Sequence, residues 1–263
     1  MMKSLLMRII LLTLSMSVVF AGDLRVNILN GTSGGKGAAD RVALVDLNAG
    51  MVEVASEENV KGSVTFDNIS SDLQTQYLLR ATLGGVNYSE MFIPSPGVTA
   101  WETNVTVYNT SDAEMQVAPS VPFFVIYAFE DRVYIQKRII LENISNPPVT
   151  YSSSPGMVKV HVPENAELDN FTFKHGDMPL RTSAIATEAG QVIPNALKPG
   201  SSEIDIAYYL PYPNSQVDLT EVFGYEIEHF HLYAMPIDLM VVSKGLTREG
   251  TDNENGFAIY ARE

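Results

Sequence analysis

Two histidines separated by a single residue, His229 and His231, are the pair in this sequence best placed to bind a metal ion. In the segment Glu226–His231 a β-strand would project both imidazoles from one face, about 6.5 Å apart. Two such rings supply two ligands to Zn²⁺, and a carboxylate can complete the set. No third ligand has a recognisable spacing, and Tyr225 and Tyr233 share that face. Packing of the two rings among aromatic side chains is therefore the alternative.

The acidic segment Arg248–Gly256 offers the oxygen ligands that Ca²⁺ prefers. Its carboxylates belong to Glu249, Asp252 and Glu254. Their spacing does not match the helix–loop–helix calcium loop, and no helix is predicted on either side. A solvated hairpin turn is the alternative. The sequence therefore indicates no resident cofactor, with Zn²⁺ at the histidine pair and Ca²⁺ at this segment as the two candidates.

The segment Tyr208–Pro213 is rich in tyrosine and proline, and it contains the candidate partner-binding residues Tyr209 and Tyr212. Surface tyrosines provide rigid, amphipathic contact area for sugars, peptides or proteins. The alternative is an edge strand that runs into a turn, with Tyr208 buried.

Motifs for enzymatic catalysis are weak throughout the chain. No Gly-x-Ser-x-Gly elbow occurs, and His161 and His175 have no nucleophile at a recognisable offset. The absence of cysteine excludes thiolate catalysis, cysteine zinc sites and iron–sulfur clusters. A triad assembled only in the folded chain would leave little trace in one sequence. No catalytic residue is assigned, and a non-enzymatic role is favoured.

The elements that must position these residues are predicted to be β-strands almost throughout. Alternation of apolar and polar residues predicts strands at 24–28, 42–47, 62–69, 77–83, 86–93, 105–107, 123–129, 133–143, 158–162, 204–208, 225–233, 237–242 and 257–260. Both faces of 123–129 are apolar, which indicates a central strand. Many short strands with Gly and Pro turns between them and no helices favour an all-β fold of two tandem β-sandwich domains, the second of them immunoglobulin-like.

The first 21 residues have the layout of a secretory signal peptide. Lys3 and Arg8 precede the apolar run Ile9–Phe20, and the small Ala21 stands at the expected cleavage point. An uncleaved anchor is the alternative, but a spanning helix needs about 20 mostly apolar residues, and this run is shorter. We expect a signal-peptide helix that is removed. Export through the general secretory route then delivers a soluble periplasmic or extracellular protein that is not an integral membrane protein.

Composition narrows the class of partner. The 263 residues include 17 Lys and Arg against 31 Asp and Glu, a formal net charge of −14. Such a chain repels nucleic acid, because binding to the phosphate backbone needs clustered basic side chains. A secreted chain of this length without a single disulfide fits a bacterial envelope.

The first predicted sandwich resembles a known family. Val26–Thr32, a glycine-rich turn and Val42–Leu47, followed by Val60–Ile69 and Tyr77–Thr82, resemble carboxypeptidase regulatory-like domains, which are transthyretin-like (prealbumin-like) sandwiches. Lys61 departs from the family pattern, in which an acidic residue or Asn commonly precedes the turn glycine. The resemblance covers residues 23–93 and implies an accessory module without catalytic residues. The two-domain plan is similar to that of bacterial exported proteins.

The predicted organisation is a signal peptide at 1–21, a carboxypeptidase regulatory-like sandwich at 22–95, a linker or bridging strand at 96–121, and a second sandwich at 122–263. The favoured function is that of an exported, non-enzymatic envelope protein with a binding or scaffold role toward a protein or glycan partner. The alternative is a secreted metal-dependent hydrolase or metal-binding protein that uses His229 and His231.

Overall fold

The computed structural model describes residues 21–72, 75–176 and 178–262, and it consists almost entirely of β-strands. The predicted all-β fold is confirmed. Within these ranges the single helical element is the short 3₁₀ turn η1 (Pro213–Ser215). No helix in the described part of the chain is long and apolar enough to cross a membrane. Residues 1–20 of the predicted signal peptide lie outside the described residues.

The amino-terminal half contains two sheets around one core. The first sheet has three strands in the order β4 (Ser63–Ser70), β1 (Ala21–Asn30) and β7 (Ala100–Val107). The second sheet has four strands in the order β3 (Val52–Lys61), β2 (Ala38–Asp46), β5 (Tyr77–Leu83) and β6 (Val86–Phe92). Strict alternation along β1 buries Leu24, Val26 and Ile28 completely. Strand β7 pairs in parallel with β1, and its Val105 and Val107 belong to the same core, although the sequence placed β7 in the linker segment.

The carboxyl-terminal half is built on an eight-stranded sheet. Its order is β14 (Met178–Arg181), β13 (Glu167–His175), β17 (Gly200–Pro211), β10 (Arg132–Asn143), β9 (Val117–Ala128), β18 (Phe230–Met235), β20 (Phe257–Arg262), β19 (Thr247–Asp252). A smaller sheet of β12 (Val158–Val160), β16 (Gly190–Ile193) and β15 (Ile185–Thr187) accompanies it. Strand β9 is central, as its two apolar faces indicate, and it pairs in parallel with β18.

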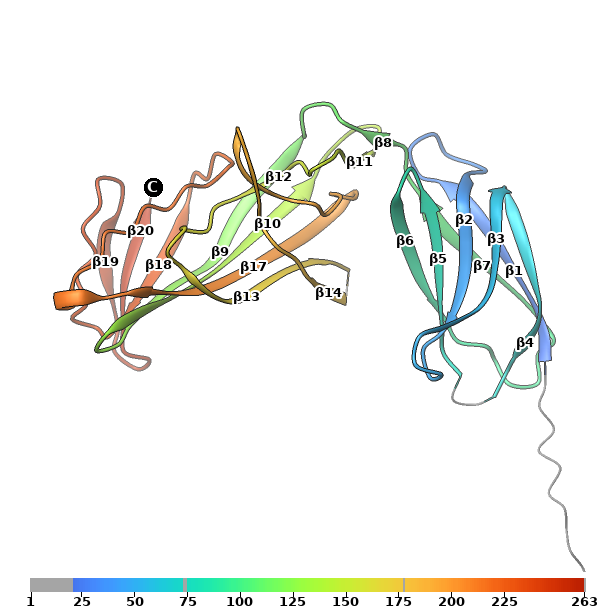
Figure 1. The fold of residues 1–263 in the computed structure, drawn as a ribbon, viewed down its shortest axis with the longest axis horizontal. Coiled ribbons are helices and arrows are strands. Elements are labelled where there is room, and N and C mark those ends of the chain that lie inside the picture. The colour runs from blue at the N-terminus through green and yellow to red at the C-terminus, as the bar shows by residue number, and fades with distance from the viewer. Residues whose placement is uncertain (1–20, 73–74, 177, 263) are drawn as a thin grey trace, which may run out of the picture.

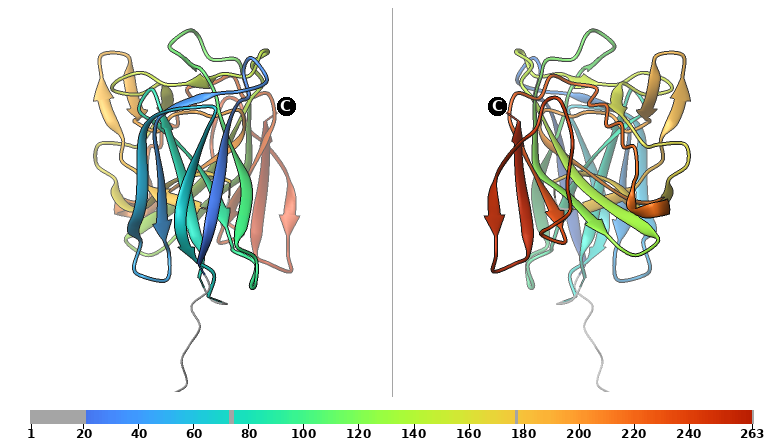
Figure 2. Two further views of the ribbon diagram at one scale, coloured as in Figure 1. Left: turned by 90° about the vertical axis from the view of Figure 1, so that its right-hand side faces the viewer. Right: turned by 90° about the vertical axis from the view of Figure 1, so that its left-hand side faces the viewer.

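The two halves lie end to end, with the short strands β8 (Thr110–Ser111) and β11 (Thr150–Tyr151) between them (Figure 1). There β8 pairs with β11. The Tyr88 hydroxyl lies 2.9 Å from Oγ1 of Thr150, and the Thr32 hydroxyl donates to the carbonyl oxygen of Pro148 at 2.6 Å. Strands β19 and β20 occupy the end of the molecule farthest from the amino-terminal half (Figures 1 and 2).

Two of the predicted strands differ from the structure. Strand β18 begins at Phe230, so residues 225–229 are not strand, and 237–242 is not a strand either. Pro236 has no N–H to donate, and its carbonyl oxygen accepts from the N–H of Leu239 at 2.8 Å, which forms a turn. Residues 239–242 keep the alternating burial of a strand but have no strand beside them. The alternating pattern determines which side chains of a segment are buried, whereas a hydrogen-bonded β-strand also needs a neighbouring strand.

Candidate functional site

Three tyrosines stand side by side on the outer face of the eight-stranded sheet. Along β10, Val133 and Ile135 point into the core, so Tyr134 points outward. The strand register places Tyr134 opposite Tyr209 of β17 on one side and opposite Tyr127 of β9 on the other. The ring centroids of Tyr134 and Tyr209 are 4.8 Å apart, and those of Tyr134 and Tyr127 are 6.1 Å apart. Directly opposed aromatic residues stabilise a sheet through such contacts.

The same line of rings continues over the neighbouring strands. Phe257 of β20 lies 5.9 Å from Tyr127 and 6.1 Å from Tyr233 of β18, and His231 lies 6.4 Å from Tyr233, all between ring centroids. All of these side chains are half-buried or exposed. We call this set the aromatic row; its members are Tyr209, Tyr134, Tyr127, Phe257, Tyr233 and His231. It crosses five adjacent strands, which at about 4.8 Å per strand makes it about 20 Å long.

Charged groups stand at the row. The Arg132 guanidinium lies 4.3 Å from the ring centroid of Tyr209, a cation–π contact. The Tyr134 hydroxyl donates to Oδ2 of Asp169 at 3.0 Å. Partial burial, reinforced by this carboxylate, raises the pKa of Tyr134 to about 12. At the other end Nε2 of His231 lies 3.4 Å from Oε2 of Glu249. The row therefore combines flat apolar faces with hydrogen-bonding and charged groups at its margins.

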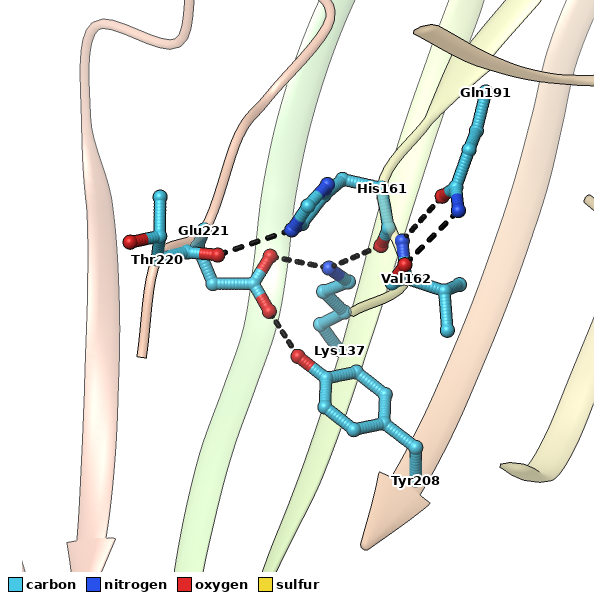
Figure 3. A network of polar contacts seen from close by, with 7 residues as sticks. All are labelled: Lys137, His161, Val162, Gln191, Tyr208, Thr220 and Glu221. Carbon is cyan, nitrogen blue, oxygen red and sulfur yellow. Dashed lines mark hydrogen bonds and ion pairs between the residues drawn. The ribbon is translucent and has the colours of Figure 1, made fainter. Parts of the chain in front are cut away.

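The inner face of the same strands carries a buried polar network (Figure 3). Lys137 of β10 is 1% exposed, and its ammonium forms an ion pair with Glu221 and donates to the carbonyl oxygen of His161 at 3.1 Å. The Tyr208 hydroxyl donates to the second carboxylate oxygen of Glu221. Nε2 of His161 lies 3.0 Å from the carbonyl oxygen of Thr220. The network connects β10 and β17 with the irregular segment that contains Glu221.

This network is saturated by its own members. Burial lowers the pKa of Lys137, which Glu221 opposes, and burial beside Glu221 raises the pKa of Tyr208. Both carboxylate oxygens of Glu221 are already engaged, one by Lys137 and one by Tyr208. A buried pair with both partners satisfied is a structural contact that holds the Glu221 segment against the sheet.

The two histidines predicted as metal ligands do not form a strand pair. His229 precedes β18 and is exposed, while His231 lies within β18 in the aromatic row. Among the described residues, no group of three or more His, Asp or Glu side chains is close enough together to hold a metal ion. The His231–Glu249 contact is the nearest approach of a carboxylate to either ring that the structure records.

The acidic segment Arg248–Gly256 spans the hairpin between β19 and β20. The Asp252 carboxylate accepts from the backbone N–H groups of Glu254 and Asn255, both at 3.1 Å, and from the Asn255 amide at 2.8 Å. These hydrogen bonds lower the pKa of Asp252. Its oxygens are therefore occupied by the turn itself.

The two tyrosines predicted to bind a partner lie on different surfaces. Tyr209 belongs to the aromatic row, whereas Tyr212 packs against the core on the opposite side, with its N–H bonded to the carbonyl oxygen of Asp131 at 2.9 Å. His161 takes part in the buried network, and Nδ1 of His175 contacts the Ser202 hydroxyl at 3.0 Å. Burial lowers the pKa of His175, with a further contribution from the charge of Lys198.

The sequence pointed to Tyr209, His231 and Tyr233, but it did not connect them with Tyr134, Tyr127 and Phe257. Tyr127 was visible as an apolar residue on one face of a central strand, and the alternation along β10 already placed Tyr134 opposite its core face. The alternation along each strand thus predicted on which face of the sheet each of these residues lies. The neighbours across strands, including Phe257, follow only from the strand order.

Comparison with known proteins adds little to this geometry. No protein-family model matches the chain, and no curated protein matches it. The chain is similar to the full-length major pilin SpaD from Corynebacterium diphtheriae, at 10% identity and a TM-score of 0.25, over 80% of this chain and 59% of that one. It is also similar to the full-length RrgB pilus protein from Streptococcus pneumoniae, at 8% identity and a TM-score of 0.24, over 73% of this chain and 45% of that one. The chain spans less than two thirds of either protein, and TM-scores this low carry no inference about arrangement or function.

Proposed function

We propose that this protein is an exported, non-enzymatic envelope protein that binds a protein or glycan partner through the aromatic row. The row carries the proposal, because it joins six aromatic side chains by ring contacts on one solvent-facing side of the sheet. Aromatic rings on a rigid sheet present a large contact area at a small cost in conformational entropy. Binding surfaces are enriched in tyrosine for this reason.

The remaining parts of the proposal come from the sequence. The signal-peptide layout supports export to the periplasm or the extracellular space. The resemblance of residues 23–93 to carboxypeptidase regulatory-like domains supports an accessory role for the amino-terminal half. In this proposal the protein is a scaffold that holds the row in place, and the partner contributes whatever chemistry follows.

The test is capture of a partner from an envelope fraction with the purified chain as bait. We expect Tyr209→Ala to lower capture at least tenfold, because it removes one end of the row and the ring under Arg132. Met91→Ala is the matched control, since Met91 is 59% exposed on β6 in the amino-terminal half, away from the row. Equal capture by the two variants, with both folded as judged by their thermal melting, would refute the proposal.

The same experiment separates a protein partner from a glycan. Protease digestion of the envelope fraction before capture abolishes binding if the partner is a protein. It leaves binding intact if the partner is a glycan, in which case digestion with glycosidases abolishes it.

A further inference from the structure

A groove of about 1050 Å³ lies over the inner face of the eight-stranded sheet, on the side opposite the aromatic row. Its floor includes Phe124 of β9 and Phe230 and Leu232 of β18, which are buried core residues. Its walls come from two irregular segments, 217–223 and 239–243. The groove is thus a gap in the layer that covers this sheet.

Both walls have the side-chain pattern of a β-strand. In 217–223 the side chains of Val217, Leu219 and Phe223 pack against the core, while alternate residues are exposed. In 239–242, Leu239 and Val241 pack against the core, while Met240 and Val242 are exposed. Such alternation is what two strands of a covering sheet would show.

The backbone of the first wall is almost entirely unpaired. Among the described residues, the carbonyl oxygen of Thr220 is the only backbone group of 217–223 with a hydrogen-bond partner, the His161 ring. His161 directly follows β12, so this edge of the wall faces the small sheet. Because successive backbone groups of an extended segment point to opposite edges, the groups of Leu219 and Glu221 point to the other edge, toward the groove.

The second wall is fixed to the sheet but also lacks a strand neighbour. The Tyr260 hydroxyl accepts from the N–H of Val241 and donates to the carbonyl oxygen of Leu239, both at 3.1 Å. Within the described ranges, the backbone groups of Met240 and Val242 have no partner. The first wall is held as firmly, by the Glu221–Lys137 pair. Two fixed walls with free backbone groups therefore border one gap.

We infer that this groove accepts one extended β-strand from a partner protein, inserted between 217–223 and 239–243. Unpaired strand edges are templates for strand addition, in which backbone hydrogen bonds give affinity and alternate side chains enter the apolar floor. The net charge of −14 favours a strand that carries Lys or Arg at its outward positions. This inference rests on the proposed binding role and specifies a protein partner for a second surface.

The test uses synthetic peptides and the full chain. The probe is an eight-residue peptide in which Val and Lys alternate, with blocked ends. The control has the same composition with four Val followed by four Lys, which cannot place its apolar side chains on one face. We expect saturable binding of the alternating peptide, at least tenfold tighter than the control, with amide chemical-shift changes confined to 217–223, 239–243 and the floor strands.

Two variants locate the binding. Ser243→Tyr adds a ring inside the groove, and we expect it to weaken peptide binding at least tenfold. Val222→Tyr is the matched control, because Val222 is 53% exposed and does not line the groove. Tyr209→Ala must leave peptide binding unchanged. The peptide experiment therefore tests the groove alone, and partner capture tests the aromatic row. Equal affinity for the two peptides would overturn the inference. So would a dimer that Ser243→Tyr dissolves, which would assign the groove to a second copy of this chain.

Discussion

The outer and inner faces of strands β10 and β17 place similar residues in opposite situations. Tyr208 and Tyr209 are neighbours in sequence, but Tyr208 is completely buried and hydrogen-bonded to Glu221, whereas Tyr209 is half-buried in the aromatic row. On the inner face each polar group has a partner within the network. On the outer face the rings touch one another but leave their surfaces to solvent. The buried network on the inner face of these two strands therefore contributes stability, and the aromatic row on their outer face is available for recognition.

The largest expected effect comes from breaking the inner network. Glu221→Ala leaves the ammonium of Lys137 buried without its counter-ion, which costs about 3–5 kcal/mol of unfolding free energy. Urea denaturation measures this loss. The double variant Lys137→Met/Glu221→Leu removes both charges and should recover most of it.

A matched control for that prediction lies on the outer face of the same strands. Arg138 and Asp205 form a partly exposed ion pair, with 2.7 Å between Nε and Oδ1. Asp205→Ala should cost about 1 kcal/mol or less, because solvent screens such pairs. A loss as large as that of Glu221→Ala would remove the distinction between the two faces.

The next effect concerns the middle of the aromatic row. Tyr134→Ala removes two ring contacts and should cost about 1–3 kcal/mol, since each aromatic pair contributes about 0.5–1.5 kcal/mol. Partner capture should fall by at least tenfold at the same time. Retained capture together with this loss of stability would mean that the row serves only to support the sheet.

The ionisation of Tyr134 gives a smaller, pH-dependent effect. Its pKa is raised to about 12, so the folded state prefers the protonated phenol. The contribution of the protonated phenol to the unfolding free energy is fully present below about pH 10, the pKa of tyrosine in the unfolded chain. It is lost as the pH rises toward 12. Tyr134→Phe should therefore reduce the fall in stability over this interval, measured by urea denaturation at pH 9 and pH 11. An unchanged fall would show that the pKa of Tyr134 is not raised in the folded state.

The smallest expected effect is at the histidines. Zn²⁺ titrated into the purified chain and into His229→Ala should bind equally weakly, because His229 precedes β18 and stands outside the row. Calorimetry measures both affinities. A clear loss of Zn²⁺ affinity in the variant would restore the metal-binding alternative, with the metal site next to the aromatic row.

The sequence predicted the fold class and the direction of many side chains. Alternation along β10 placed Ile135, Ile139 and Leu141 together on one face, and all three are buried in the core. It was wrong at 237–242, where the alternating pattern persists without a paired strand. It also grouped Tyr209 with Tyr212, which lie on different surfaces because the strand pairing with β10 continues to Tyr212 and residues three positions apart on a strand face opposite sides.

The sequence by itself determined which residues point inward, because the period of two along a strand is a local property of the backbone. Only the tertiary structure decided which residues meet. Tyr134 faces Tyr209 because β10 and β17 pair, and Lys137 meets Glu221 across 84 positions of sequence. Strand order and register depend on contacts between distant segments, and a local pattern carries no information about its neighbour across the sheet. The aromatic row and the groove are both products of that order.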